Sequence, residues 1–183
     1  LALLLEGEPG IGKTALWREG LAASEEEGFR SLVTRASEAE AQLPFVGLID
    51  LLAGVLDEAL PALPAPQARI LEMALLRAEP AGSPADHLTV SLACLQVLRG
   101  LADRDPLALA VDDLQWLDRS SSRVLAFCLR RFESRPICLV ATRRIEGDLA
   151  LTPELERALG EVPLERLALG PLAGNALDLV LRD

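Results

Sequence analysis

Eight consecutive residues near the start of the chain have the types and spacing needed to bind phosphate. They read Gly-Glu-Pro-Gly-Ile-Gly-Lys-Thr and satisfy the pattern G-x-x-x-x-G-K-[ST] in full. Glycines let successive backbone N–H groups converge on phosphate oxygens at a helix N-terminus, where the helix dipole also favours anions. Lys13, the only lysine in the chain, is expected to bridge the terminal phosphates, and the Thr14 hydroxyl to ligate Mg²⁺. The residues expected to hold the nucleotide are Gly7, Glu8, Pro9, Gly10, Ile11, Gly12, Lys13 and Thr14.

About 100 residues after this pattern, an apolar run ends in two adjacent acidic residues. The sequence at 107–113 is Leu-Ala-Leu-Ala-Val-Asp-Asp, which is the form of a Walker B element. We expect Asp112 to belong to the magnesium site and Asp113 to polarise the attacking water. Two acids after a strand are often only a turn that caps a helix, but the complete phosphate loop upstream favours the Walker B interpretation.

Polar residues also end the next apolar run, at 137–141. Thr142 and Arg143 follow it, where a neighbouring strand would direct polar groups at a γ-phosphate. Arginine suits this role because its guanidinium donates two parallel hydrogen bonds to phosphate oxygens. The alternative is that Arg143 and Arg144 form a solvated turn. The three residues expected to act in catalysis are Lys13, Asp113 and Arg143.

The elements that must position these residues alternate along the chain. Apolar runs predict strands, and stretches with apolar residues every three or four positions predict helices. Alternating strands and helices imply a parallel sheet covered on both faces, so the fold class is α/β. The predicted strands are 1–6, 29–34, 107–111, 137–141 and 164–169. The predicted helices are 14–26, one block at about 43–104 that includes a start at Ser83-Pro84, one begun by Asp118 or Ser120 to Ser122, and one at 153–159.

Length and composition exclude several classes of protein. At roughly 150 residues per domain, 183 residues predict a single domain over 1–183. The net charge of −10 argues against direct contact with DNA, and apolar runs are too short to span a membrane. The three cysteines, Cys94, Cys128 and Cys138, form no C-x-x-C pair and are interpreted as reduced, buried thiols. The expected location is the cytoplasm.

Four segments together resemble one family of ATPases. They are Gly-Glu-Pro-Gly-Ile-Gly-Lys-Thr at 7–14, Leu-Pro-Phe at 43–45, Asp-Asp-Leu-Gln-Trp-Leu-Asp at 112–118 and Ala-Thr-Arg-Arg at 141–144. The chain resembles the AAA-type ATPase domain of signal-transduction ATPases with numerous domains, specifically that of the large LuxR-family transcriptional regulators. It is also similar to the ATPase modules found beside adenylate cyclase domains. The double acid followed by Trp116 and Asp118 is the most specific part of this resemblance.

The resemblance implies a fold and a function. The fold is a P-loop NTPase three-layer sandwich with strand order 5-1-4-3-2 and a helical insertion between strands 2 and 3. The function is an ATP- and Mg²⁺-binding switch that hydrolyses ATP slowly and controls signalling through protein partners or self-association. In that family a helical lid and an output domain follow, and the output domain, a C-terminal helix-turn-helix, would make any DNA contact. We therefore interpret the chain as an internal fragment of a longer regulator.

Three other functions are compatible with the same motifs. The first is an AAA-type ATPase that remodels or loads a partner, as origin-recognition-like proteins do. A motor of that kind should show partner-stimulated turnover, whereas a switch should hold ATP. A small-molecule kinase needs a basic clamp, and the block at 36–106 is Leu-rich with few Arg. A degenerate scaffold is disfavoured because Lys13, Thr14, Asp112 and Asp113 are intact.

Overall fold

Five parallel strands form one sheet in the computed structural model, which describes residues 1–76, 86–132, 134–145 and 150–171. The order is β2-β3-β4-β1-β5, the same as the expected 5-1-4-3-2. The α/β fold class and all five predicted strands are thereby confirmed. The strands are β1 (Ala2–Gly7), β2 (Arg30–Arg35), β3 (Leu107–Asp112), β4 (Ile137–Arg144) and β5 (Leu164–Ala168).

The strand register brings the chemically important ends of the strands together. Because all pairs are parallel, the carboxyl ends of the strands lie along one edge of the sheet. Gly7 at the end of β1 is level with Arg144 at the end of β4. Arg35 at the end of β2 is level with Asp112 at the end of β3. The phosphate loop, the two acids and the Thr142 segment thus leave the sheet at the same edge.

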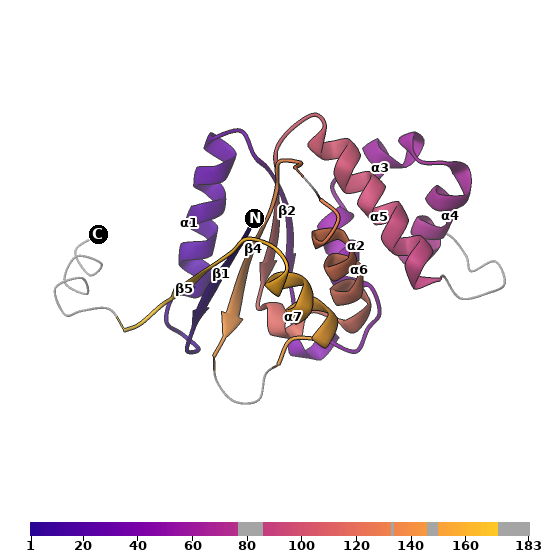
Figure 1. Ribbon diagram of the computed structural model, residues 1–183. Coiled ribbons are helices and arrows are strands. Elements are labelled where there is room, and N and C mark those ends of the chain that lie inside the picture. The colour runs from indigo at the N-terminus through magenta and orange to yellow at the C-terminus, as the bar shows by residue number, and fades with distance from the viewer. Residues whose placement is uncertain (77–85, 133, 146–149, 172–183) are drawn as a thin grey trace.

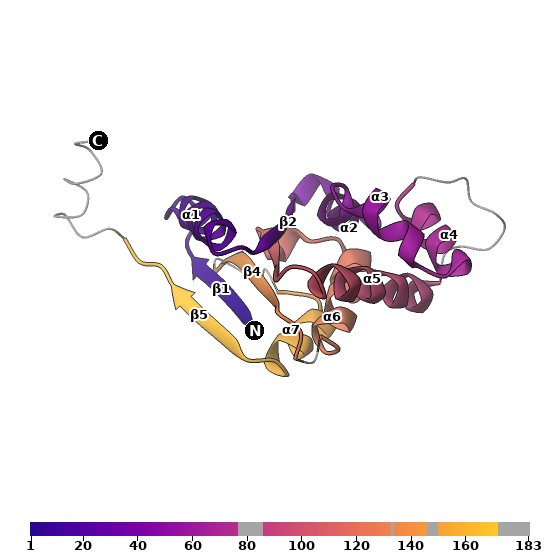
Figure 2. The same cartoon turned by 90° about the horizontal axis from the view of Figure 1, so that it is seen from above.

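A single helix, α1 (Lys13–Glu26), covers one face of the sheet in the described structure (Figure 2). Trp17 and Leu21 are its buried apolar residues, and they pack in a small cluster with Leu5 of β1 and two alanines of β3. The indole Nε1 of Trp17 also donates to the Val140 carbonyl of β4 at 3.0 Å. This cluster fixes the helix that starts directly after the phosphate loop.

The opposite face carries the larger hydrophobic core. Alternate side chains of the central strands point into it, where they meet apolar residues of several helices. The sheet therefore lies between two helical layers, which is the expected three-layer arrangement (Figures 1 and 2). The helices that contribute to this core include α2 (Val46–Leu52), α5 (His87–Ala102), α6 (Arg119–Leu129) and α7 (Pro153–Gly160).

The segment between β2 and β3 is helical, as predicted. It contains α2 and α5 together with α3 (Leu56–Ala59), α4 (Ala65–Ala74) and two short 3₁₀ turns, η1 (Glu38–Glu40) and η2 (Leu60–Ala62). Helices α3 and α4 pack on α5 at its outer side (Figure 1). The structure describes α5 from His87, with Asp86 as its N-cap. The predicted start at Ser83-Pro84 lies outside the described residues.

None of the described helices is long and apolar enough to cross a membrane. All three cysteines are free. Cys94 and Cys128 are buried as expected, whereas Cys138 is only half-buried.

Candidate nucleotide site

The phosphate loop closes around its own lysine. Gly10 and Gly12 have φ values of 77° and 96°, in the left-handed region that glycine adopts without strain, and Gly12 is the N-cap of α1. The Lys13 Nζ donates to the carbonyl oxygens of Gly7 at 2.9 Å and Glu8 at 2.7 Å. Lys13 is only 6% exposed, and this desolvation lowers its pKa despite the nearby acids. The ammonium group is thus held at the centre of the loop by two backbone carbonyl oxygens.

Two hydroxyl groups meet on one carboxylate beside the loop. Thr14 Oγ1 donates to Asp112 Oδ1 at 3.1 Å, and Thr142 Oγ1 donates to the same oxygen at 2.6 Å. Asp112 is only 7% exposed. The hydroxyl of Thr14 and the carboxylate of Asp112 are hard oxygen donors, the type that Mg²⁺ prefers when substrate phosphates and water complete its shell. These residues therefore fit magnesium, whereas no cluster of three His, Cys, Asp or Glu among the described residues could hold a metal.

Asp113 is held differently from Asp112. Its backbone is left-handed, with φ 54° and ψ 52°, and its N–H donates to Thr142 Oγ1 at 2.7 Å. Its carboxylate accepts two hydrogen bonds from the Arg144 guanidinium, at 3.1 and 2.9 Å, and one from Gln115 at 2.8 Å. Burial alone would raise the pKa of Asp113, but the hydrogen bonds from Arg144 and Gln115 lower it overall. The lowered pKa favours the ionised carboxylate, and three hydrogen bonds hold that carboxylate in place.

The ion pair that Arg143 forms with Glu6 of β1 lies outside this cluster. Strand β4 extends to Arg144, beyond its predicted end at Ala141, so successive side chains alternate between the two faces. Arg143 shares a face with Ala141 and pairs with Glu6 of β1 at 3.6 Å. Arg144 instead shares a face with Thr142 and reaches Asp113.

Asp118 connects the segment after the two acids to the helical block. It caps α6 by accepting the N–H groups of Ser120 and Ser121, as one of the sequence alternatives expects. It also accepts the N–H groups of Phe45 and Gly47 at the start of α2, at 2.9 and 3.0 Å. Sequence reasoning missed this second role, although the motifs at 43–45 and 112–118 were both singled out.

A hollow of about 760 Å³ lies beside the phosphate loop. It is bounded by the loop on one side and by the ends of β4 and β5 on the other. Its lining is mostly backbone and apolar side chains, and an acidic side chain, Glu8, is present at its edge. The lining residues are Gly7, Glu8, Pro9, Ile11, Ile145, Leu169, Gly170 and Pro171.

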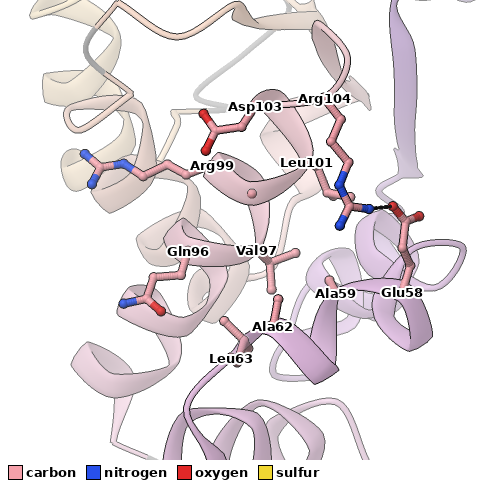
Figure 3. A pocket seen from close by; sticks show the side chains of 11 residues that line it. Glu58, Ala59, Ala62, Leu63, Gln96, Val97, Arg99, Leu101, Asp103 and Arg104 are labelled. Carbon is pink, nitrogen blue, oxygen red and sulfur yellow. Dashed lines mark hydrogen bonds and ion pairs between the residues drawn. The ribbon is translucent and has the colours of Figure 1, made fainter.

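A second hollow, of about 270 Å³, lies far from the loop between α3, η2 and the C-terminal half of α5 (Figure 3). Glu58 on its rim pairs with Arg104 and with Arg30, the first residue of β2. The hydrogen bond from Arg30 is the main reason that the pKa of Glu58 is lowered. This hollow therefore lies near the amino ends of the strands, at the edge opposite the nucleotide site.

Comparisons with known proteins agree with this arrangement. A family model described as the AAA ATPase domain matches residues 1–140. Cdc6p from Pyrobaculum aerophilum is similar in structure, with a TM-score of 0.62 and 16% identity over 98% of this chain and 42% of that one. A chain in the structure of Drosophila ORC bound to AT-rich DNA and Cdc6 gives 0.53 and 16%, over 97% of this chain and 52% of that one.

The chain thus spans about half the length of these structural neighbours or less. No curated protein sequence matches it significantly. The family model covers well over half of the chain, including the phosphate loop and both acids. By these residues and this fold, the chain belongs to the AAA ATPase domain family.

Proposed function

We propose that this chain is a magnesium-dependent ATP switch, which binds ATP, hydrolyses it slowly to ADP and phosphate, and passes its nucleotide state to a protein partner. The observation that carries the proposal is the meeting of Thr14 and Thr142 on Asp112, next to the loop that surrounds Lys13. A P-loop scaffold that no longer binds nucleotide would not need these contacts. The apolar hollow beside the loop suits the base and sugar of the nucleotide.

Each residue of the site has a separate task in this proposal. The terminal phosphates of ATP replace the carbonyls of Gly7 and Glu8 as acceptors for the Lys13 ammonium, because a charged acceptor forms the stronger hydrogen bond. Thr14 and Asp112 would hold magnesium, which neutralises charge on the transferring phosphate. Asp113 then orients and polarises the attacking water as general base.

A nucleotide switch and an ATPase that loads a partner differ in what drives ATP hydrolysis. The switch function rests on the motif resemblance to the LuxR-type regulators. The similarity in fold to Cdc6p and the ORC chain favours a second candidate, an ATPase that loads or remodels a partner. A switch holds ATP until a signal arrives, whereas a loader accelerates hydrolysis when its partner binds. Turnover of the full-length protein with and without co-purified partners distinguishes the two candidates.

The decisive variant for the site is Asp113→Asn, measured by single-turnover hydrolysis beside an equilibrium ATP titration. It keeps the shape of the side chain and removes the charge, so transition-state stabilisation falls while ATP is still bound. We expect hydrolysis to fall by about 10²-fold or more. The matched control is Asp105→Asn, an exposed acid at the opposite edge of the sheet. Equal hydrolysis in Asp113→Asn and the parent would remove Asp113 from the mechanism.

A further inference from the structure

The hollow between α3, η2 and the C-terminal half of α5 has an apolar floor. Val97 and Leu101 of α5 line it on one side, and their exposed fractions are only 2% and 3%. Ala62 and Leu63, at the end of η2, line it on the other side. Figure 3 shows the side chains of Ala62 and Leu63 directed toward Val97. An apolar group placed between these walls would displace water from apolar surface, which is favourable.

Gly100 leaves room for such a group. It lies within α5 and lines the hollow, and a Cβ at this position would meet nothing within 4 Å. Glycine in a helix interior is less stable than alanine, so α5 loses stability at the position that keeps this space open. The volume of about 270 Å³ corresponds to about nine water molecules in the liquid, which is room for a ligand of about ten non-hydrogen atoms.

Positive charge is in excess at the rim of the hollow. Glu58 pairs with Arg104 and, at 2.8 Å, with Arg30, so two guanidinium groups share one carboxylate and the three side chains carry a net charge of +1. Asp103, the other acid in the lining, already pairs with Arg135 at 3.2 Å. A further carboxylate would therefore meet a guanidinium group here, although the chain as a whole carries a net charge of −10.

We propose that this hollow is a binding site for a small carboxylate with an apolar body, of the kind that a medium-chain fatty acid represents. The apolar body lies between α5 and η2, and the carboxylate accepts the guanidinium fork of Arg104 in competition with Glu58. The occupant is a free small molecule, because the hollow has space for only about ten non-hydrogen atoms. The site lies at the edge of the sheet opposite the nucleotide site, so the inference does not depend on the proposed ATPase function.

Octanoate is the probe, because its size matches the volume of the hollow. Isothermal titration calorimetry of this chain without nucleotide should give a dissociation constant of about 0.1 to 1 mM, as expected for a ligand of this size. Acetate lacks the apolar body and octylammonium lacks the negative charge, so both should bind at least about tenfold more weakly. Absence of octanoate binding, or equal binding of octanoate and octylammonium, would overturn the inference.

Filling the hollow from within α5 tests where octanoate binds. Gly100→Leu places a large apolar side chain in the open space and raises the helix propensity of α5, so the fold should be retained. We expect octanoate affinity to fall by at least about tenfold. The matched control is Gly20→Leu in α1, where a Cβ also meets nothing within 4 Å, and it should keep the affinity of the parent. Circular dichroism verifies that both variants are folded. Parental octanoate affinity in Gly100→Leu would mean that the ligand binds elsewhere, and the inference would be wrong.

Replacing each partner of the ion pair at the rim should shift octanoate affinity in opposite directions. Arg104→Gln removes the guanidinium fork, so octanoate should bind about five- to tenfold more weakly. Glu58→Gln removes the competing acceptor, so octanoate should bind about two- to fivefold more tightly. The matched controls, Arg18→Gln and Glu19→Gln, make the same charge changes at exposed positions of α1, on the other face of the sheet, and should leave the affinity unchanged. A merely structural role of the ion pair predicts no opposite shifts, so equal affinities in Arg104→Gln and Glu58→Gln would overturn the inference.

Discussion

Asp118 accepts the backbone N–H of Phe45, 73 residues earlier in the chain, at 2.9 Å. The same side chain accepts three further N–H groups, from Gly47, Ser120 and Ser121, and is only 3% exposed. One carboxylate therefore caps α2 and α6 at once. It ties the segment that follows the two acids to the helical block.

Replacing Asp118, which caps two helices, should lower the free energy of unfolding much more than replacing a residue that caps one helix. Asp118→Ala leaves four N–H groups without their acceptor, and we expect a loss of about 3 kcal/mol in the free energy of unfolding. The matched control is Asp86→Ala, which removes the exposed cap of α5 alone. Urea unfolding of both variants measures the difference. Equal losses would show that the bonds to α2 contribute nothing.

Gly47 and Gly100 should respond in opposite directions to the same substitution. A Cβ on Gly47 would lie 2.3 Å from Leu117 Cδ1 and 3.4 Å from Asp118 Oδ2, so Gly47→Ala should destabilise the fold by about 1 to 3 kcal/mol. A Cβ on Gly100, in α5, would meet nothing within 4 Å. Gly100→Ala should therefore stabilise by about 0.5 to 1 kcal/mol through reduced chain entropy. Thermal unfolding of the pair checks both signs.

The Thr14 hydroxyl should control the effect of magnesium on ATP binding. Thr14→Val keeps the shape of the side chain and removes the oxygen that contacts Asp112. We expect it to lose about tenfold of the affinity that magnesium adds, whereas Thr14→Ser, which retains the hydroxyl, should lose little. Titrations of ATP with magnesium and with a chelator provide the measurement. An identical magnesium effect in Thr14→Val and Thr14→Ser would contradict this assignment.

Cys94 and Cys128 should resist alkylation in the native protein. Burial raises the pKa of Cys128 well above its usual range, so the reactive thiolate is scarce as well as inaccessible. Raising the pH from 7 to 9, across the ordinary thiol pKa of about 8.5, should accelerate alkylation in the unfolded chain but not at Cys128 in the folded one. Mass spectrometry after timed iodoacetamide treatment reports both states. Rapid native labelling of Cys128 would mean that α5 and α6 separate readily.

The fold was largely predictable because the strands are continuous apolar runs that end at recognisable polar signals. Their spatial order was not contained in those runs, since strands buried on both faces show no alternation, and it came from the family resemblance. The positions of the phosphate loop and Asp112 at one edge of the sheet were predictable because both come directly after strand ends.

The faces on which Arg143 and Arg144 lie were harder to predict, for a physical reason. A strand side chain changes face with every residue, so the choice between Arg143 and Arg144 depends on how far β4 extends. The predicted end at Ala141 placed both beyond the strand, with Arg143 assigned to the γ-phosphate and a solvated turn as the alternative, whereas the observed strand sends them to opposite faces. The contact of Gln115 with the Arg144 backbone and the second role of Asp118 both join residues that are distant in sequence, which no local pattern records.

The thin apolar layer under α1 has a thermodynamic consequence. On that face, the described buried core consists of Leu5, Trp17, Leu21, Ala108 and Ala110, whereas the other face has a far larger one. The helix that begins at the phosphate loop is thus joined to the rest of the molecule by little buried surface. A ligand that contacts both the loop and Asp112 therefore supplies part of its attachment, and at 100 times its dissociation constant would add about 2.7 kcal/mol. Amide hydrogen exchange along α1 should accordingly record nucleotide occupancy more sensitively than exchange along α5.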